Sequence, residues 1–83
     1  MDYDRDRVDE VVLALMFLTI HDHGRAWKGF DWGSLNRLHD KGMIGNPVSK
    51  AKSVILTEEG EVESERLFWK FFGVPEAPSG TRA

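Results

Sequence analysis

The stretch from Leu35 to Gly60 constrains the fold more than any other part of the chain. It contains a helical segment, a glycine, a short apolar segment, a polar turn, a second apolar segment and a new helix start. Gly42 is the residue type that ends helices in the left-handed conformation. Thr57 is a favoured N-cap, and the two glutamates after it suit the positive end of a helix dipole. The order predicts a helix, a β-hairpin and a further helix.

The hairpin has two short apolar segments as its expected strands. Met43 and Ile44 form the first, and residues 54–56 form the second, with Val54 and Leu56 on one face. Residues 48–52 are expected at the tip of the hairpin. The helices are bounded by similar local signals: the first follows a cap at Asp4 and ends near Gly24, the second follows Asp31, and the last runs from about Glu58 to Phe72.

Two parts of the sequence resemble known families. The segment LNRLHDKGMI…SVILTEEG resembles the recognition helix, wing and last helix of winged-helix regulators. RAWKGFDW followed by LHDKGMIGNPVSKAKSVILTEEG is similar to a small bacterial family of unknown function, over nearly the whole chain. Together with the local signals, this implies a mainly α fold with a small β-hairpin, an α+β class with a winged-helix-like core. Residues 24–30 are too few for the extra helix of a full winged helix, so the helix-turn-helix is expected to be truncated to a loop or a single helical turn.

The length of 83 residues predicts a single domain over residues 1–72, followed by a disordered tail over residues 73–83 that is rich in proline and glycine. The chain has no cysteine, which excludes disulfides. Its longest apolar run, residues 11–18, is too short to cross a membrane, and its acidic start is unlike a signal peptide. The expected location is therefore cytoplasmic, with no membrane partner.

Charge is distributed unevenly along the chain. The net charge is −3, but residues 25–52 hold six basic and two acidic groups. Basic residues on the second helix and on the wing could contact duplex DNA, with the helix in the major groove and the wing on phosphate. The same residues could equally be a solvated face. The candidate nucleic-acid contacts are Ser34, Arg37, Lys41, Lys50 and Lys52.

Three aromatic residues lie around the truncated segment. Trp27, Phe30 and Trp32 are expected to fill the core where the missing helix would pack, because buried aromatics dominate small cores. Trp32 would join Leu35 and Leu38 on the core side of the second helix. Since basic residues adjoin these aromatics, stacking on nucleic-acid bases is the alternative.

The first helix carries apolar residues on two sides. The larger set is expected to face the core and comprises Val8, Val11, Val12, Leu15 and Leu18. The second set, Leu13, Phe17 and Ile20, together with Val62 and Trp69 on the last helix, predicts a homodimer interface. The segment around Trp27 could instead cover the Leu13 set within one chain.

No motif in the sequence supplies a catalytic constellation, a phosphate loop or a set of metal ligands at ordered spacing. His21 and His23, near the end of the first helix, are expected to bond its carbonyls rather than to bind metal together with His39 or Asp22. We therefore expect no enzyme activity, no cofactor and no small-molecule substrate. Two functions remain compatible with the sequence: a nucleic-acid-binding regulator, and a homodimeric protein-interaction module that does not bind DNA.

Overall fold

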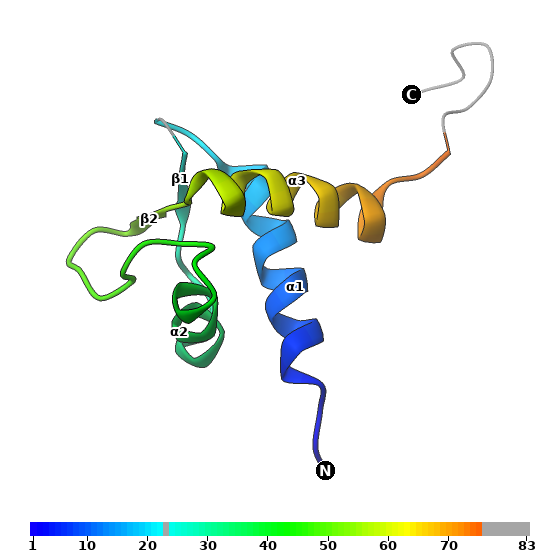
Figure 1. Ribbon diagram of the computed structural model, residues 1–83, viewed down its shortest axis with the longest axis horizontal. Coiled ribbons are helices and arrows are strands. Elements are labelled where there is room, and N and C mark those ends of the chain that lie inside the picture. Colours follow the sequence, from blue (N-terminus) through cyan, green and yellow to red (C-terminus); the bar gives the residue numbers. More distant parts are fainter. Residues whose placement is uncertain (23, 76–83) are drawn as a thin grey trace.

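The structure is a computed structural model that describes residues 1–22 and 24–75. It is a small α+β fold of three α-helices, a short 3-10 helix and a two-stranded antiparallel sheet (Figure 1). In chain order the elements are α1 (Arg5–Met16), η1 (Phe17–Thr19), β1 (Arg25–Trp27), α2 (Trp32–Asp40), β2 (Ser53–Ile55) and α3 (Glu58–Phe72). Most of the predicted tail, residues 76–83, lies outside the described residues.

Each α-helix begins at the residue that the sequence predicts. The side chains of Asp4 and Asp31 accept hydrogen bonds from the backbone amides three residues later, at 3.0 and 3.1 Å. The hydroxyl of Thr57 accepts one from Gly60 N at 2.9 Å. These bonds satisfy backbone donors that a helix start leaves open. Gly42, with φ of +78°, follows α2 as expected.

The end of the first helix differs from the prediction. The α-helix ends at Met16 and continues as the 3-10 turn η1, rather than running to Gly24. Gly24 instead lies in a tight turn with φ of +90°, and its neighbour Arg25 pairs with His21 through two backbone hydrogen bonds of 2.7 Å. This turn leads the chain directly into β1.

The predicted hairpin is only partly right. β2 pairs with β1, with Ala26 opposite Val54, so residues 24–30 hold a strand rather than a loop or a helical turn. The other expected strand contributes an isolated bridge between Ile44 and Leu56, supported by a 2.8 Å hydrogen bond from Gly45 N to the Ile55 carbonyl. β2 therefore lies between β1 and the chain around Ile44.

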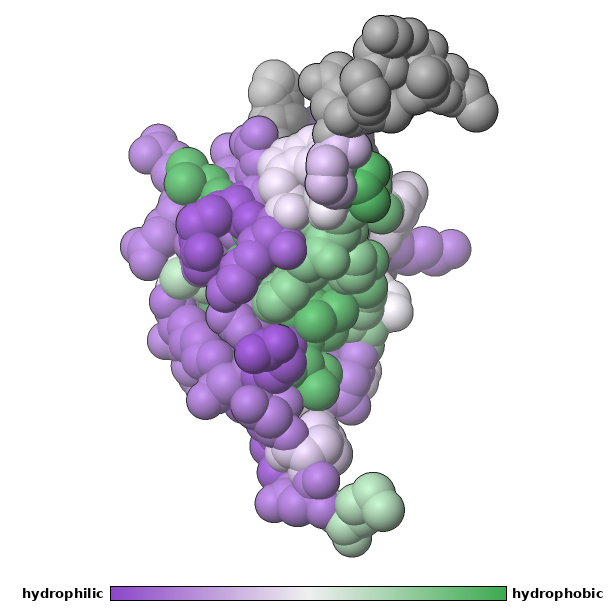
Figure 2. Space-filling model, turned by 90° about the vertical axis from the view of Figure 1, so that its right-hand side faces the viewer, coloured by the Kyte–Doolittle hydropathy of each residue, from purple (hydrophilic) through white to green (hydrophobic). Residues whose placement is uncertain are grey.

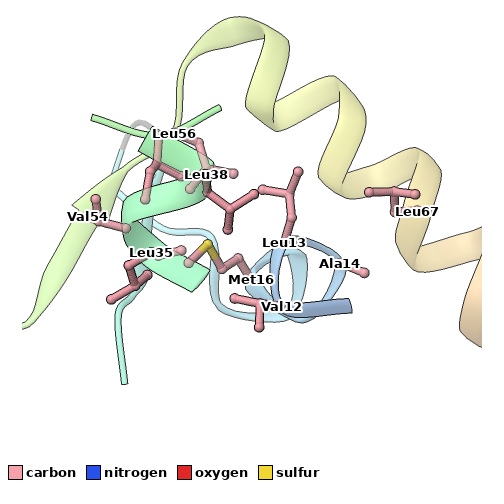
Figure 3. Close-up of a cluster of buried hydrophobic side chains, with 11 residues drawn as sticks. Val12, Leu13, Ala14, Met16, Leu35, Leu38, Val54, Leu56 and Leu67 are labelled. Atoms are coloured by element: carbon pink, nitrogen blue, oxygen red, sulfur yellow. The ribbon is translucent and has the colours of Figure 1, made fainter. Parts of the chain in front are cut away.

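The hydrophobic core lies where α1, α2, α3 and the sheet meet. In Figure 3, Leu13 and Met16 of α1 point toward Leu35 and Leu38 of α2, while Ala14 points toward α3. Figure 1 shows α3 lying across α1, with α2 beside α1 on the side of the strands. The buried apolar set is Val12, Leu13, Ala14, Met16, Ala26, Leu35, Leu38, Ile44, Val54, Leu56 and Leu67.

Candidate interaction surfaces

The basic side chains of α2 and its C-cap pair with acidic side chains of α1, although Lys41 remains 44% exposed. Arg37 donates from Nε and Nη2 to the two carboxylate oxygens of Asp9 on α1, at 2.6 and 2.9 Å. Lys41 reaches Asp6 at 3.2 Å and Asp9 at 3.7 Å. Ser34 is fully buried beside the Arg37 guanidinium. Of the three residues predicted to enter a DNA groove, Arg37 and Lys41 are thus drawn to α1 by its acidic side chains, and Ser34 is buried beside them.

Asp9 is a buried charge whose partners keep it ionised. Only 1% of its surface is exposed. Burial alone would raise the pKa of its carboxyl group, but hydrogen bonds from Arg37 and Ser34 and the charges of Arg37 and Lys41 outweigh it. The pKa of Asp9 is therefore lowered from its ordinary value. The same hydrogen bond raises the pKa of Arg37.

The remaining two predicted DNA contacts, Lys50 and Lys52, are exposed on the loop before β2. This loop is held by Lys28, whose ammonium group donates to the Pro47 carbonyl at 2.8 Å and to the Ser49 carbonyl and hydroxyl at 3.0 Å. By donating to three oxygen atoms of this loop, the Lys28 ammonium group holds the loop in place. Lys50 and Lys52 are thus presented on an ordered segment.

Two of the aromatics predicted to fill the core lie at the surface instead. Trp27 and Trp32 are both about half exposed, and only Phe30 packs against the core. Trp27 stacks beside the His21 ring at 4.9 Å, and Trp32 lies under the Lys28 ammonium at 5.9 Å. The pairing of β1 with β2 explains the exposure of Trp27, since Ala26 and Val54 already fill the core side of the sheet.

The histidines contact backbone carbonyls where the structure describes them. His21 Nδ1 lies 2.7 Å from the Thr19 carbonyl oxygen, and His39 Nδ1 lies 3.2 Å from that of Ile44. His23 lies outside the described residues. Within the described part of the chain, no three histidine or acidic side chains are grouped as metal ligands would be.

An open crevice of about 170 Å³ lies where the three α-helices meet. Its apolar lining comes from Leu13, Leu38, Met43 and Leu67. Charged side chains from all three helices surround it, with Asp9, Glu10 and Glu63 acidic and Lys41 basic.

The core side of α1 agrees only in part with the prediction, since Val12 is buried and Val8 packs against the core as expected. The core side carries Leu13, which is 2% exposed, together with Val12 and Met16. Leu13 is thus part of the core and not of any surface. Most of the set predicted for the core lies at least partly at the surface: Leu18 is 65% exposed, and Val8, Val11 and Leu15 are half-buried. Figure 2 shows a hydrophobic band on one face of the molecule, bordered by hydrophilic surface.

The remaining predicted interface residues fall into two groups. Ile20 is half-buried and packs against the core. Phe17, Val62 and Trp69 reach the surface, and Phe17 joins an aromatic cluster with α3, its ring 5.2 Å from Phe68 and 6.3 Å from Trp69. The cluster continues from Phe68 to Phe72 at 5.5 Å.

Trp69 is the most prominent member of this aromatic cluster. It is 57% exposed although two other rings orient it, with Phe68 at 5.1 Å and nearly perpendicular. Large aromatic side chains at the surface usually mark a contact site. The sequence pattern did not place Leu18 and Phe72 at the surface. Phe72 could have been found, because it lies three residues after Trp69 on the same helix.

The fold and its surfaces together define a small α+β domain that exposes apolar side chains on η1, α2 and α3. The chain belongs to the family described as a domain of unknown function, DUF6429, whose model matches residues 4–74. It is 51% identical over 72 residues to the "Uncharacterized protein y4hR" of Sinorhizobium fredii (strain NBRC 101917 / NGR234), which covers 87% of this chain and 97% of that protein.

No solved structure matches the chain significantly. Among the helices of residues 1–22 and 24–75, none has the length and apolar character that crossing a membrane requires.

Proposed function

We propose that this domain is a protein-interaction module that self-associates through the apolar face of α3 and η1. We define this face by Phe17, Leu18, Val62, Trp69 and Phe72. The observation that carries the proposal is the exposure of Trp69, which is oriented by Phe17 and Phe68 but not covered by them. A rigid, preoriented tryptophan loses little conformational freedom on binding, and this favours it as an anchor of an interface.

The size of the domain also favours self-association. A chain of this length buries only about 60% of the surface that its unfolded form exposes, so its own core has limited stabilising capacity. The half-buried apolar side chains of α1, which are Val8, Val11 and Leu15, add further apolar surface. Covering such surface with a second copy removes it from water, at a gain of about 25 cal/mol per Å².

Recognition of duplex DNA by α2 is the weaker alternative. Ser34, Arg37 and Lys41 would have to leave their contacts with α1 to enter a groove, and Asp9 would then be a buried charge without its main partner. Lys50 and Lys52 remain accessible on the loop before β2. They support, at most, contacts to phosphate that do not depend on sequence.

The test is the dimer dissociation constant of Trp69→Ala, with Trp32→Ala as its matched control. The two tryptophans are similarly exposed, at 57% and 53%, but Trp32 lies on α2, away from the proposed face. Trp69→Ala should raise the dissociation constant at least about 30-fold, because an anchoring tryptophan typically contributes about 2 kcal/mol or more. Trp32→Ala should leave it unchanged. Equal effects of the two changes would contradict the proposed face.

A further inference from the structure

Lys28 places two half-exposed tryptophans at the two ends of one loop segment. Its backbone amide donates to the Lys52 carbonyl at 3.1 Å, so Lys52 lies beside the end of β1, which is Trp27. Its ammonium group lies 3.0 Å from the Ser49 carbonyl oxygen and 5.9 Å from the centre of the Trp32 ring. The loop between Ser49 and Lys52 thus extends from the neighbourhood of Trp32 to that of Trp27.

This loop and β1 also gather positive charge that the fold leaves without ion pairs. Four basic residues here have no ion-pair partner among residues 1–22 and 24–75, and they are Arg25, Lys28, Lys50 and Lys52. The basic side chains on α2 and at its C-cap, by contrast, pair with carboxylates of α1. Among the described residues, the one other basic side chain without an ion pair is Lys70 on α3. The unpaired positive charge is therefore concentrated around the two tryptophans.

The Trp27 ring lies on the outer face of the sheet. Trp27 and Arg25 alternate with the buried Ala26, and Trp27 is opposite Ser53 across the strands. The Arg25 guanidinium donates to the Ser53 hydroxyl at 3.1 Å. The His21 ring packs against Trp27 at 4.9 Å, with 35° between the ring planes, and Trp27 stays 50% exposed. An aromatic ring of fixed orientation, with polar groups beside it, is thus presented to solvent.

Exposed aromatic rings beside unpaired cations are the groups with which proteins bind single-stranded nucleic acids, because bases stack on the rings and phosphates contact the cations. We infer that the surface formed by Trp27, Trp32, Lys50 and Lys52 binds a single-stranded nucleic acid. We name this surface the tryptophan–lysine face. It adds a second binding site to the proposed self-association and shares no residue with the face of α3 and η1.

The chemistry of the tryptophan–lysine face favours a single strand over other anionic partners. In a duplex the bases stack on one another, whereas a single strand offers the faces of its bases to Trp27 and Trp32. An anionic membrane would require a broad apolar surface that enters its interfacial layer. The groups beside Trp27 are instead the polar side chains of Arg25 and Ser53, which suit phosphate and sugar oxygens.

The stacking contacts are tested by fluorescence anisotropy of a labelled oligothymidine of about ten nucleotides, at about 50 mM salt. Trp27→Ala and Trp32→Ala should each raise its dissociation constant about tenfold, because each removes a ring on which a base stacks. Trp27→Phe keeps an aromatic ring and should weaken binding less than Trp27→Ala. Tyr3→Ala is the control, because Tyr3 is 57% exposed and also lies beside a cation, Arg5 at 4.7 Å, but is not part of this face. It should leave the constant unchanged.

The phosphate contacts are tested by the salt dependence of the same dissociation constant. For a single strand, the slope of its logarithm against the logarithm of salt concentration is about 0.7 for each phosphate that the protein neutralises. Lys50→Ala and Lys52→Ala should therefore each lower this slope by about 0.7. Lys70→Ala is the matched control, because Lys70 is exposed and lies on α3, and it should leave the slope unchanged.

The remaining outcomes would overturn the inference. An unmodified chain that does not bind the oligothymidine at about 50 mM salt contradicts it, as do Trp27→Ala and Trp32→Ala variants that bind like the unmodified chain. Duplex DNA bound as tightly as the single strand would exclude base stacking. Binding to phosphatidylglycerol vesicles but not to the oligothymidine would assign this face to a membrane surface. Circular dichroism checks the fold of each variant, and Trp32→Ala and Trp27→Phe still decide the matter if Trp27→Ala does not fold.

Discussion

Arg37 on α2 and Asp9 on α1 are joined by two parallel hydrogen bonds across 28 residues of sequence. Asp9 is buried, and Arg37 is partly exposed. This pair fixes the basic side of α2 against the first helix. It therefore decides both how the helices pack and which surfaces are left for partners.

Removing the guanidinium alone should destabilise the fold strongly. Arg37→Leu leaves the Asp9 carboxylate buried with only the Ser34 hydroxyl and the Lys41 ammonium at 3.7 Å, so we expect a loss of about 3 kcal/mol in the free energy of unfolding. Urea denaturation measures it. The double variant Asp9→Leu/Arg37→Leu should recover most of the loss, because no unpaired charge remains. A double variant that is as unstable as the sum of the two single variants would show that the pair is not coupled.

The Asp9–Arg37 pair should also make stability depend on pH. The pKa of Asp9 is lower in the folded chain than its ordinary value, so the stabilisation that it supplies is complete above that ordinary value, about 3.9. It is lost as the pH falls through the lowered folded-state pKa. The difference in unfolding free energy between the unmodified chain and Asp9→Asn should therefore shrink from pH 7 toward about pH 3. A difference that stays constant over this range would contradict the assignment. The pKa of Glu63, lowered chiefly by its hydrogen bond from Arg66, affects both proteins alike.

Gly60 should tolerate no side chain. A Cβ at this position would overlap the carbonyl oxygen of Met43, where the first turn of α3 passes the chain after α2. Alanine ordinarily stabilises a helix relative to glycine by about 1 kcal/mol, but Gly60→Ala should cost about 3 kcal/mol here. Thermal unfolding shows directly whether Gly60→Ala lowers or raises the stability of the fold. Gly29→Ala is the control, because nothing lies within 4 Å of its added carbon, and it should change stability little.

Local signals predicted the ends of most elements correctly. The caps at Asp4, Asp31 and Thr57, the glycine stop at Gly42 and the bounds of α3 follow from side-chain hydrogen bonds and backbone preferences within a few residues. Such signals are readable in a sequence because both partners are adjacent. They predicted the helices of this α+β fold but not the full arrangement of its strands.

The errors all involve partners far apart in the sequence. Strands of three residues such as β1 have too weak a pattern to reveal that they pair with a segment almost thirty residues away. Asp9 is buried one helical turn before Leu13, and its pairing with Arg37, 28 residues away, compensates the cost of burying its charge. The apolar spacing within α1 does not reveal this pairing, so Leu13 was assigned to the second apolar set. The pairing of β1 with β2 leaves Trp27 at the surface, and the burial of the Asp9 side of α1 leaves Leu18 there.

Duplex DNA should bind this chain weakly and without sequence preference. Because Ser34, Arg37 and Lys41 face α1, only contacts such as those of Lys50 and Lys52 are left to reach phosphate. Any binding seen by fluorescence anisotropy at about 50 mM salt should vanish by about 200 mM. Lys50→Ala/Lys52→Ala should abolish it. Sequence-selective binding that survives the higher salt would favour a DNA-binding regulator over the interaction module.

Sedimentation equilibrium of the unmodified chain tests self-association most directly. Over a range of micromolar concentrations, the mass should rise from the 9.5 kDa of one chain toward twice that value. The mass should stop at the dimer, because a two-fold interface uses the face of both copies and closes. A mass of 9.5 kDa at every concentration would contradict the account.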